Sequence, residues 1–343
     1  MTFLPELARE ALLAEKLGGG KVRCQACAQR CLTAPGGCGR CGVRFNEGGV
    51  LKAPWGYVSS AAPDPIEKKP FFHVLPGART LSFGMFGCNF HCGFCQNWQI
   101  ADVNPALFQE AGQSGGVKAA GGLKPLETSP AELVSEALAI GAGVVVSTYN
   151  EPLITAEWAA AVFSGAKEKK LRTAFVSNGY ATPETAAFLR PVLDLWKVDL
   201  KCFSDENYRK VCGAELSKVL EGIRIILAAG FWVEVVTLVI PGFNDSDAEL
   251  GAMADFLAGL SKDIPWHLTA FHPDHLMTGT PPTPQETLYR DRDIDRAAGN
   301  RYVYCGNTRG AAGQDTVCPS CGLAVIEREG FSVKNNLLGK NGA

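Results

Sequence analysis

Charge of one sign and long apolar runs are both missing from this sequence of 343 residues. Its 33 basic and 35 acidic side chains leave a formal net charge of -2, which gives no general attraction for nucleic acid or anionic lipid. The most apolar segment, 223–240, is interrupted by Arg224 and Glu234, whereas a membrane-spanning helix needs about 20 apolar residues. We therefore expect neither a membrane span nor a nucleic-acid partner.

Two further signals are missing. The first 20 residues carry Glu6, Glu10 and Glu15 and lack the basic-then-apolar order of a secretion signal, so we expect a cytoplasmic protein. Neither a G-x-G-x-x-G pattern nor a P-loop lysine occurs. The glycine-rich segment 111–125 is therefore predicted to be a mobile loop that closes over a site, and not a phosphate cradle.

Cysteine, by contrast, is abundant, with thirteen residues. Disulfides are uncommon in a reducing cytosol, so clustered cysteines there more often bind metal or do chemistry. Eleven of the thirteen fall in three groups, and each group contains a C-x2-C pair. The other two, Cys202 and Cys212, are expected to pack in the core as small hydrophobic residues.

Composition and pattern divide the chain into three regions. Residues 1–75 are predicted to open with a helix, followed by a cysteine- and glycine-rich extension. Residues 76–275 alternate strand-like and helix-like segments. Residues 276–343 form a C-terminal extension with a C-P-x-C-G pattern typical of a zinc knuckle.

The central region predicts an α/β fold. Ser129 to Glu132 form a capping box that starts a helix. Six segments have the character of strands: 80–87, 143–149, 171–176, 193–200, 231–240 and 265–271. Strands that alternate with helices indicate a parallel sheet with right-handed crossovers. Because six repeats are too few for a closed eight-stranded barrel, we expect a partial (β/α)6 TIM-like barrel.

Unusual polar residues follow these strands. They are Cys88, Cys92, Cys95, 148–152, 177–179, Asp199, Lys201, 241–245, His267 and His272. The C-terminal strand ends of (β/α) barrels carry the active site, so these segments are predicted to converge on one mouth. This clustering favours an enzyme over the alternative, a zinc-ribbon interaction module whose barrel is incidental.

The group Cys88, Cys92 and Cys95 has the spacing C-x3-C-x2-C, on a loop after the first predicted strand. Three thiolates with no fourth nearby suit a 4Fe–4S cluster that leaves one iron open. The alternative is a zinc ion completed by a distant cysteine or by His91.

This spacing, with Phe94 before the last cysteine, resembles the signature of radical S-adenosylmethionine (SAM) proteins. The similarity extends over residues 22–333 and is carried by 87–100, 148–152, 198–201 and 239–245. It is similar to the activating enzymes of pyruvate formate-lyase. Segment 64–70, the early cysteines and 318–321 resemble the AmmeMemoRadiSam branch in particular.

The resemblance implies a reaction and a set of contacts. SAM would chelate the open iron, and a low-potential donor such as flavodoxin or ferredoxin would drive its cleavage to methionine and a 5′-deoxyadenosyl radical. That radical would abstract hydrogen from an unidentified substrate, either a partner protein that receives a glycyl radical or a small molecule or peptide. The implied SAM contacts are Phe94, Asn150, Glu151, Ser177, Asn178, Asp199, Lys201 and His267.

This chain departs from its relatives in one motif, and its polar residues have one alternative role. Relatives have Gly-Gly-Glu-Pro where this chain has Tyr149, Asn150, Glu151 and Pro152. Any one of the polar residues could also serve only as a hydrogen-bond partner at a strand end, since buried polar groups need partners.

The remaining cysteines lie near the two ends: Cys24, Cys27, Cys31, Cys38, Cys41, Cys305, Cys318 and Cys321. Structural zinc is the first interpretation, because short glycine-rich segments with few core residues need a staple. An auxiliary 4Fe–4S cluster is the second. The pairing is left open, and the two ends could share one site.

Two further expectations concern the mouth. His91, Trp98, Tyr149, Phe243 and His272 are predicted to line its substrate side. Segment 64–73, with Lys68 and Lys69, leads into the first barrel strand. It is expected to support the barrel floor or dock the N-terminal extension, and not to touch substrate.

Overall fold

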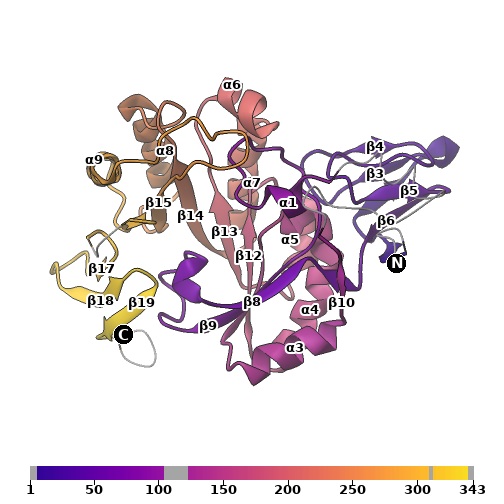
Figure 1. The fold of residues 1–343 in the computed structure, drawn as a ribbon, viewed down its shortest axis with the longest axis horizontal. Coiled ribbons are helices and arrows are strands. Elements are labelled where there is room, and N and C mark those ends of the chain that lie inside the picture. The colour runs from indigo at the N-terminus through magenta and orange to yellow at the C-terminus, as the bar shows by residue number, and fades with distance from the viewer. Residues whose placement is uncertain (1–5, 104–122, 309–311, 339–343) are drawn as a thin grey trace.

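The computed structural model describes residues 6–103, 123–308 and 312–338 (Figure 1). Its centre is an eight-stranded sheet in the order β16-β15-β14-β13-β12-β11-β9-β8. The strands are β8 (Ser60–Pro65), β9 (Arg79–Gly84), β11 (Val144–Ser147), β12 (Arg172–Ser177), β13 (Leu195–Asp199), β14 (Trp232–Val239), β15 (Trp266–Ala270) and β16 (Val303–Gly306). The last seven run parallel, and β8 pairs antiparallel with β9.

The predicted six strands are present, but the number six was too low for the described residues. The seventh parallel strand, β16, follows residue 275, and β8 precedes residue 76, so the sheet extends into both regions that we treated as extensions. We missed β16 because its four residues are bounded by polar segments and carry no long apolar run. The division at 75 and 275 stays a prediction.

Helices connect the parallel strands: α3 (Pro130–Ala139), α4 (Ala156–Glu168), α5 (Pro183–Leu189), α7 (Leu216–Ala228), α8 (Asp247–Leu260) and α9 (Gln285–Ala297). The capping box predicted at the start of α3 is confirmed, since Ser129 Oγ accepts from the Glu132 amide and the Glu132 carboxylate accepts from the Ser129 amide. No helix in the described ranges is long and apolar enough to cross a membrane.

Alternation along the strands separates the core from the site. Phe175, Trp196 and Val235 are buried in the main hydrophobic core. Their neighbours Val176 and Lys197 point to the other face and line a cavity. Successive side chains of a strand face opposite sides of the sheet, so one face packs in the main core, while the other carries a small second cluster and the cavity.

The predicted N-terminal helix is wrong for the described residues. Residues Ala8–Glu10 form β1, which pairs with β6 (Val50–Pro54), and Ala14–Lys16 form β2, which pairs with β3 (Val22–Cys24). Between β1 and β2, the Leu12 and Leu13 amides donate to the carboxylate of Glu157 on α4. The Glu157 carboxylate therefore accepts from two amides that would donate to backbone carbonyl groups if this segment were a helix.

The C-terminal part forms a small sheet, β17 (Thr316–Val317), β18 (Ala324–Glu329) and β19 (Ser332–Asn336). In Figure 1 it lies beside the segment after β8, at the opposite end of the molecule from the N-terminal strands β3, β4 (Leu32–Thr33), β5 (Phe45–Glu47) and β6. The two ends of the chain therefore cannot share one metal site, which corrects that possibility.

Candidate active site

One cavity of about 600 Å³ gathers every residue predicted for the cluster and for SAM. Its lining includes Cys88, Cys92, Cys95, Phe94, Asn150, Glu151, Ser177, Asn178, Asp199, Lys201 and His267. These residues come from five strands or the segments that follow them, spread over 180 positions of the chain. His267 is the exception to the expected placement after a strand, since it is the second residue of β15. The volume falls within the range of about 300–1,000 Å³ typical of small-molecule sites.

The cysteine loop is held in place by backbone hydrogen bonds. The His91 amide donates to the Cys212 carbonyl and the Gly93 amide to the Val211 carbonyl, both at 3.0 Å. Cys212 is buried as predicted, and a hydrogen bond with it raises the pKa of the Cys92 thiol. Burial raises the pKa of Cys95 to about 11, with the charge of Cys92 adding to the effect.

These thiols fit an iron–sulfur cluster better than one zinc ion. A 4Fe–4S cluster takes one thiolate per iron, so its ligands stand wider apart than those of one ion. Cys88, Cys92 and Cys95 line the cavity, whereas His91, the alternative zinc ligand, does not.

Glu151 joins the ends of two neighbouring strands. Its carboxylate accepts from Ser177 Oγ at 2.8 Å, from the Asn178 amide at 2.7 Å and from the Leu153 amide at 3.0 Å. Burial raises the pKa of Glu151 to about 7. With three donors from the protein itself, Glu151 orients Ser177 and Asn178 toward the cavity.

Asn150 is bound in a similar way to the cysteine loop. Its Oδ1 accepts from the Met85 amide and its Nδ2 donates to the Gly87 carbonyl, both at 3.1 Å. Asn178 Nδ2 donates to Asn89 Oδ1 at 2.7 Å. The residues next to Cys88 are therefore fixed by the ends of β11 and β12.

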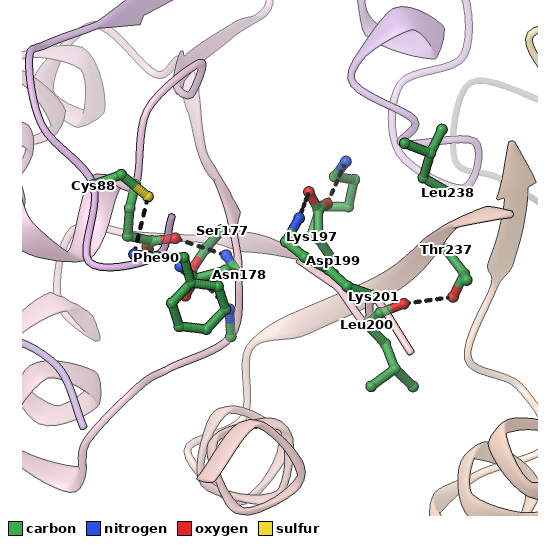
Figure 2. A network of polar contacts seen from close by, with 12 residues as sticks. Cys88, Phe90, Ser177, Asn178, Lys197, Asp199, Leu200, Lys201, Thr237 and Leu238 are labelled. Carbon is green, nitrogen blue, oxygen red and sulfur yellow. Dashed lines mark hydrogen bonds and ion pairs between the residues drawn. The ribbon is translucent and has the colours of Figure 1, made fainter. Parts of the chain in front are cut away.

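Three charged residues project into the cavity from β13 and the residues just after it. Figure 2 shows Asp199 between Lys197 and Lys201, whose Nζ atoms lie 3.0 Å and 3.2 Å from its carboxylate oxygens. Burial acts to raise the pKa of Asp199, but the two ammonium groups hold it below its usual value. Lys197 was not predicted, although its spacing of two from Asp199 places both on one strand face.

His267 forms the floor with Glu234. His267 Nε2 lies 2.7 Å from Glu234 Oε2, and both side chains are fully buried. Burial lowers the pKa of His267, while hydrogen bonding and positive neighbours lower that of Glu234 in spite of burial.

Segment 64–73 also belongs to this floor, and its expected lack of contact with substrate stays a prediction. The Phe72 and His73 amides donate to the Glu234 carboxylate at 3.0 Å, which agrees with a supporting role. However, Glu67, Lys68 and Phe72 line the cavity. The segment therefore forms part of the cavity wall as well as the floor. It is held there by the C-terminal hairpin, since Arg328 Nη2 donates to the Phe72 carbonyl.

Of the five residues predicted to line the substrate side, only one lines the cavity. Tyr149 lines the cavity, but His91, Trp98, Phe243 and His272 are not among its lining residues. Trp98 instead stacks on His275. Residues that we did not predict, Gln314 and Phe331, form part of the wall; their sequence carries no signal for this. Most of the predicted loop 111–125 lies outside the described residues.

The N-terminal cysteines surround a second, much smaller cavity. It is lined by Cys24, Cys27, Cys31 and Cys41, but not by Cys38. Burial raises the pKa of Cys41 to about 11 and that of Cys38 to about 12. The C-terminal group is not gathered in the same way, since Cys305 lines the large cavity and Cys321 is exposed.

Comparison with known proteins agrees with this site. Residues 83–257, half of the chain, match the Radical SAM superfamily, and the chain belongs to this superfamily. It is 38% identical over 328 residues to the uncharacterized protein MJ0808 of Methanocaldococcus jannaschii, covering 95% of this chain and 93% of that protein.

Homology also extends to activating enzymes. The chain is 23% identical over 249 residues to pyruvate formate-lyase 1-activating enzyme of Escherichia coli K12, covering 67% of this chain and 93% of the relative. A solved domain of a pyruvate-formate lyase-activating enzyme from Bacteroides vulgatus is 20% identical, with a TM-score of 0.44, covering 48% of this chain and 99% of that domain. Membership supports SAM binding and an iron–sulfur cluster, while the AmmeMemoRadiSam branch stays a prediction.

Proposed function

We propose that this chain binds SAM beside a 4Fe–4S cluster held by Cys88, Cys92 and Cys95, and uses it for radical chemistry on a substrate. The observation that carries the proposal is that these cysteines and all eight predicted SAM contacts line one cavity. When bound, the cluster would supply the electron that cleaves SAM to methionine and a 5′-deoxyadenosyl radical, which abstracts a substrate hydrogen.

The residues of the chain would bind and orient SAM. Lys201 lies over the Phe94 ring, with its Nζ 5.7 Å from the ring centre, and its charge acts on Cys92. It is therefore suited to meet the carboxylate of SAM next to the cluster, with Phe94 beside the adenine. Asp199 would accept from ribose hydroxyl groups. Buried Phe90 and Phe94 in the wall would exclude water from the reacting atoms.

Glu151 has a different role in this proposal from direct SAM contact. Its carboxylate oxygens already accept three hydrogen bonds from Ser177, Asn178 and Leu153. We therefore assign Glu151 to positioning, and assign SAM contact to Ser177, Asn178 and the neighbouring Asn150. His267, bonded to Glu234, would close the far end of the SAM site.

The substrate has two candidate classes. Homology to activating enzymes supports a partner protein that receives a glycyl radical. A small molecule or peptide is favoured by one observation: Gln314 and Phe331, from the C-terminal part of this chain, form part of the cavity wall. An external electron donor such as flavodoxin or ferredoxin would be needed for both. The terminal cysteines form a second metal site in this proposal, zinc or an auxiliary iron–sulfur cluster.

The test replaces Cys88, Cys92 and Cys95 together by Ala in anaerobically reconstituted protein. We expect loss of about four irons per chain and of 5′-deoxyadenosine formation from SAM with dithionite as reductant. The matched control is Cys202→Ala, which alters a buried cysteine outside the motif and outside the terminal groups. Iron content and 5′-deoxyadenosine yield that are unchanged in the triple variant would refute the assignment.

A further inference from the structure

Four buried or half-buried cysteines border one small space at the N-terminal end of the chain. Cys24, Cys27, Cys31 and Cys41 line an apolar cavity of about 10 Å³. Cys38 is left out of this group, and its Sγ donates instead to the Arg44 carbonyl at 3.3 Å. The sequence left the pairing of these five cysteines open. In the structure, four of them line the cavity and Cys38 does not.

Two buried hydrogen-bond donors belong to residues of the same wall. Arg44 Nε has no partner among the described residues, and Asn89 Nδ2 has none apart from the Cys27 thiol, with which the Asn89 side chain interacts; both residues are only 1% exposed. The other two nitrogen atoms of the Arg44 guanidinium are already hydrogen-bonded, since Nη1 and Nη2 donate to the Glu157 carboxylate at 2.7 Å and 2.8 Å.

These buried donors indicate what the cavity is built to hold. Each one costs about 1–3 kcal/mol if it stays unsatisfied. A neutral thiol is a weak acceptor, whereas a thiolate is a charged one that hydrogen-bonds much more strongly. Four thiolates in an apolar space would repel each other, so they require a cation at their centre.

We propose that Cys24, Cys27, Cys31 and Cys41 bind one Zn²⁺ ion as four thiolates, with Arg44 Nε and Asn89 Nδ2 donating to their sulfur atoms. Binding releases the four thiol protons and leaves a centre of net charge -2. A single ion matches a cavity with room for about one water-sized body, whereas a cubane cluster needs more space. The thiols do not yet converge on one point, so binding requires that they turn inward about their Cα–Cβ bonds.

This site would brace the cluster loop of the enzyme. Asn89 directly follows Cys88, and its carbonyl accepts from Gln29 Nε2 at 3.1 Å. Gln29 lies between Cys27 and Cys31, so one segment carries both the proposed zinc ligands and a bond to the loop. The inference goes beyond the proposed radical chemistry and does not depend on it.

Metal analysis of the full chain tests the proposal. In the variant lacking Cys88, Cys92 and Cys95, we expect about one zinc per chain and no stoichiometric iron. Adding Cys41→Ser should remove that zinc, while adding Cys38→Ser, the matched control, should leave it bound. Co²⁺ alone, added to the metal-free protein, should give the absorption of a tetrahedral four-thiolate centre.

A second measurement serves if Cys41→Ser fails to fold. In otherwise unaltered protein, alkylation followed by mass spectrometry should find Cys24, Cys27, Cys31 and Cys41 protected until a zinc chelator is added, whereas the chelator should not change the reactivity of Cys38. Zinc lost with Cys38→Ser, iron and sulfide in place of zinc, or four thiols that alkylate without chelator would each overturn the proposal.

Discussion

Tyr149 stands where the resemblance to radical SAM proteins leads one to expect glycine. Its φ of 71° is in the left-handed region, which costs a residue with a Cβ about 1–2 kcal/mol. Side-chain contacts hold it there, since its hydroxyl donates to Asp64 Oδ2 at 2.9 Å and Lys69 Nζ lies 4.5 Å from its ring centre. The backbone at Tyr149 therefore has a conformation that is usual for glycine, although the residue has a Cβ.

Substitution at Tyr149 measures this strain. Tyr149→Ala and Tyr149→Gly both lose the phenol, but only Ala must keep a Cβ at positive φ. We therefore expect the Gly variant to be more stable than the Ala variant by about 1 kcal/mol, measured by denaturant unfolding. Tyr149→Phe, which loses only the hydroxyl, should cost about 1 kcal/mol. Equal stability of the Ala and Gly variants would mean that the turn relaxes to another conformation.

At the scale of elements, helix α7 determines the position of the loop that follows β12. A Cβ built on Gly222 would lie 1.9 Å from the carbonyl oxygen of Gly179. The helix thus approaches the backbone next to Ser177 and Asn178 so closely that only glycine fits. This contact links helix packing to the proposed SAM site.

Gly222→Ala should therefore push the loop away. We expect a loss of about 1–3 kcal/mol in the free energy of unfolding from overpacking, together with weaker SAM binding by calorimetry. The control is Gly251→Ala in α8, where nothing lies within 4 Å of a new Cβ and stability should rise by up to about 1 kcal/mol. A Gly222→Ala variant as stable as the control would contradict the close packing.

At the scale of the whole molecule, Arg328 anchors the C-terminal hairpin to the floor of the cavity. Only 1% of this residue is exposed. Its Nη2 donates to the Phe72 carbonyl at 2.7 Å, its Nη1 to Thr316 Oγ1 at 2.8 Å, and its Nε lies 3.6 Å from Glu67 Oε1. Glu67 is equally buried, so each charge depends on the other.

Removing one of these charges should be costly. Arg328→Met leaves the Glu67 carboxylate buried without a cation, and we expect a loss of about 3–5 kcal/mol in unfolding free energy. The double variant with Glu67→Gln should recover part of that loss. Arg301→Met, which breaks an exposed pair with Asp263, should change stability by less than about 1 kcal/mol. If Arg328→Met behaves like Arg301→Met, the anchor is not a buried ion pair.

Local patterns in the sequence determined the core of the candidate site. The spacing of Cys88, Cys92 and Cys95 predicted a common metal site because one short loop carries all three. The polar residues after each strand were predicted to meet because the carboxyl ends of parallel strands share one edge. Most of them line the cavity, whereas segment 241–245 and His272 do not. The start of α3 could be predicted because a capping box is complete within four residues.

Only the tertiary structure decided the features that depend on distant partners. The first strands replace a predicted helix through Glu157, which lies 144 positions from Leu13. The cavity floor joins Phe72 to Arg328, 256 positions away. Neither of these contacts leaves a local pattern, because each arises from how the sheet brings remote segments together, and periodicity and spacing report only on neighbours in the chain.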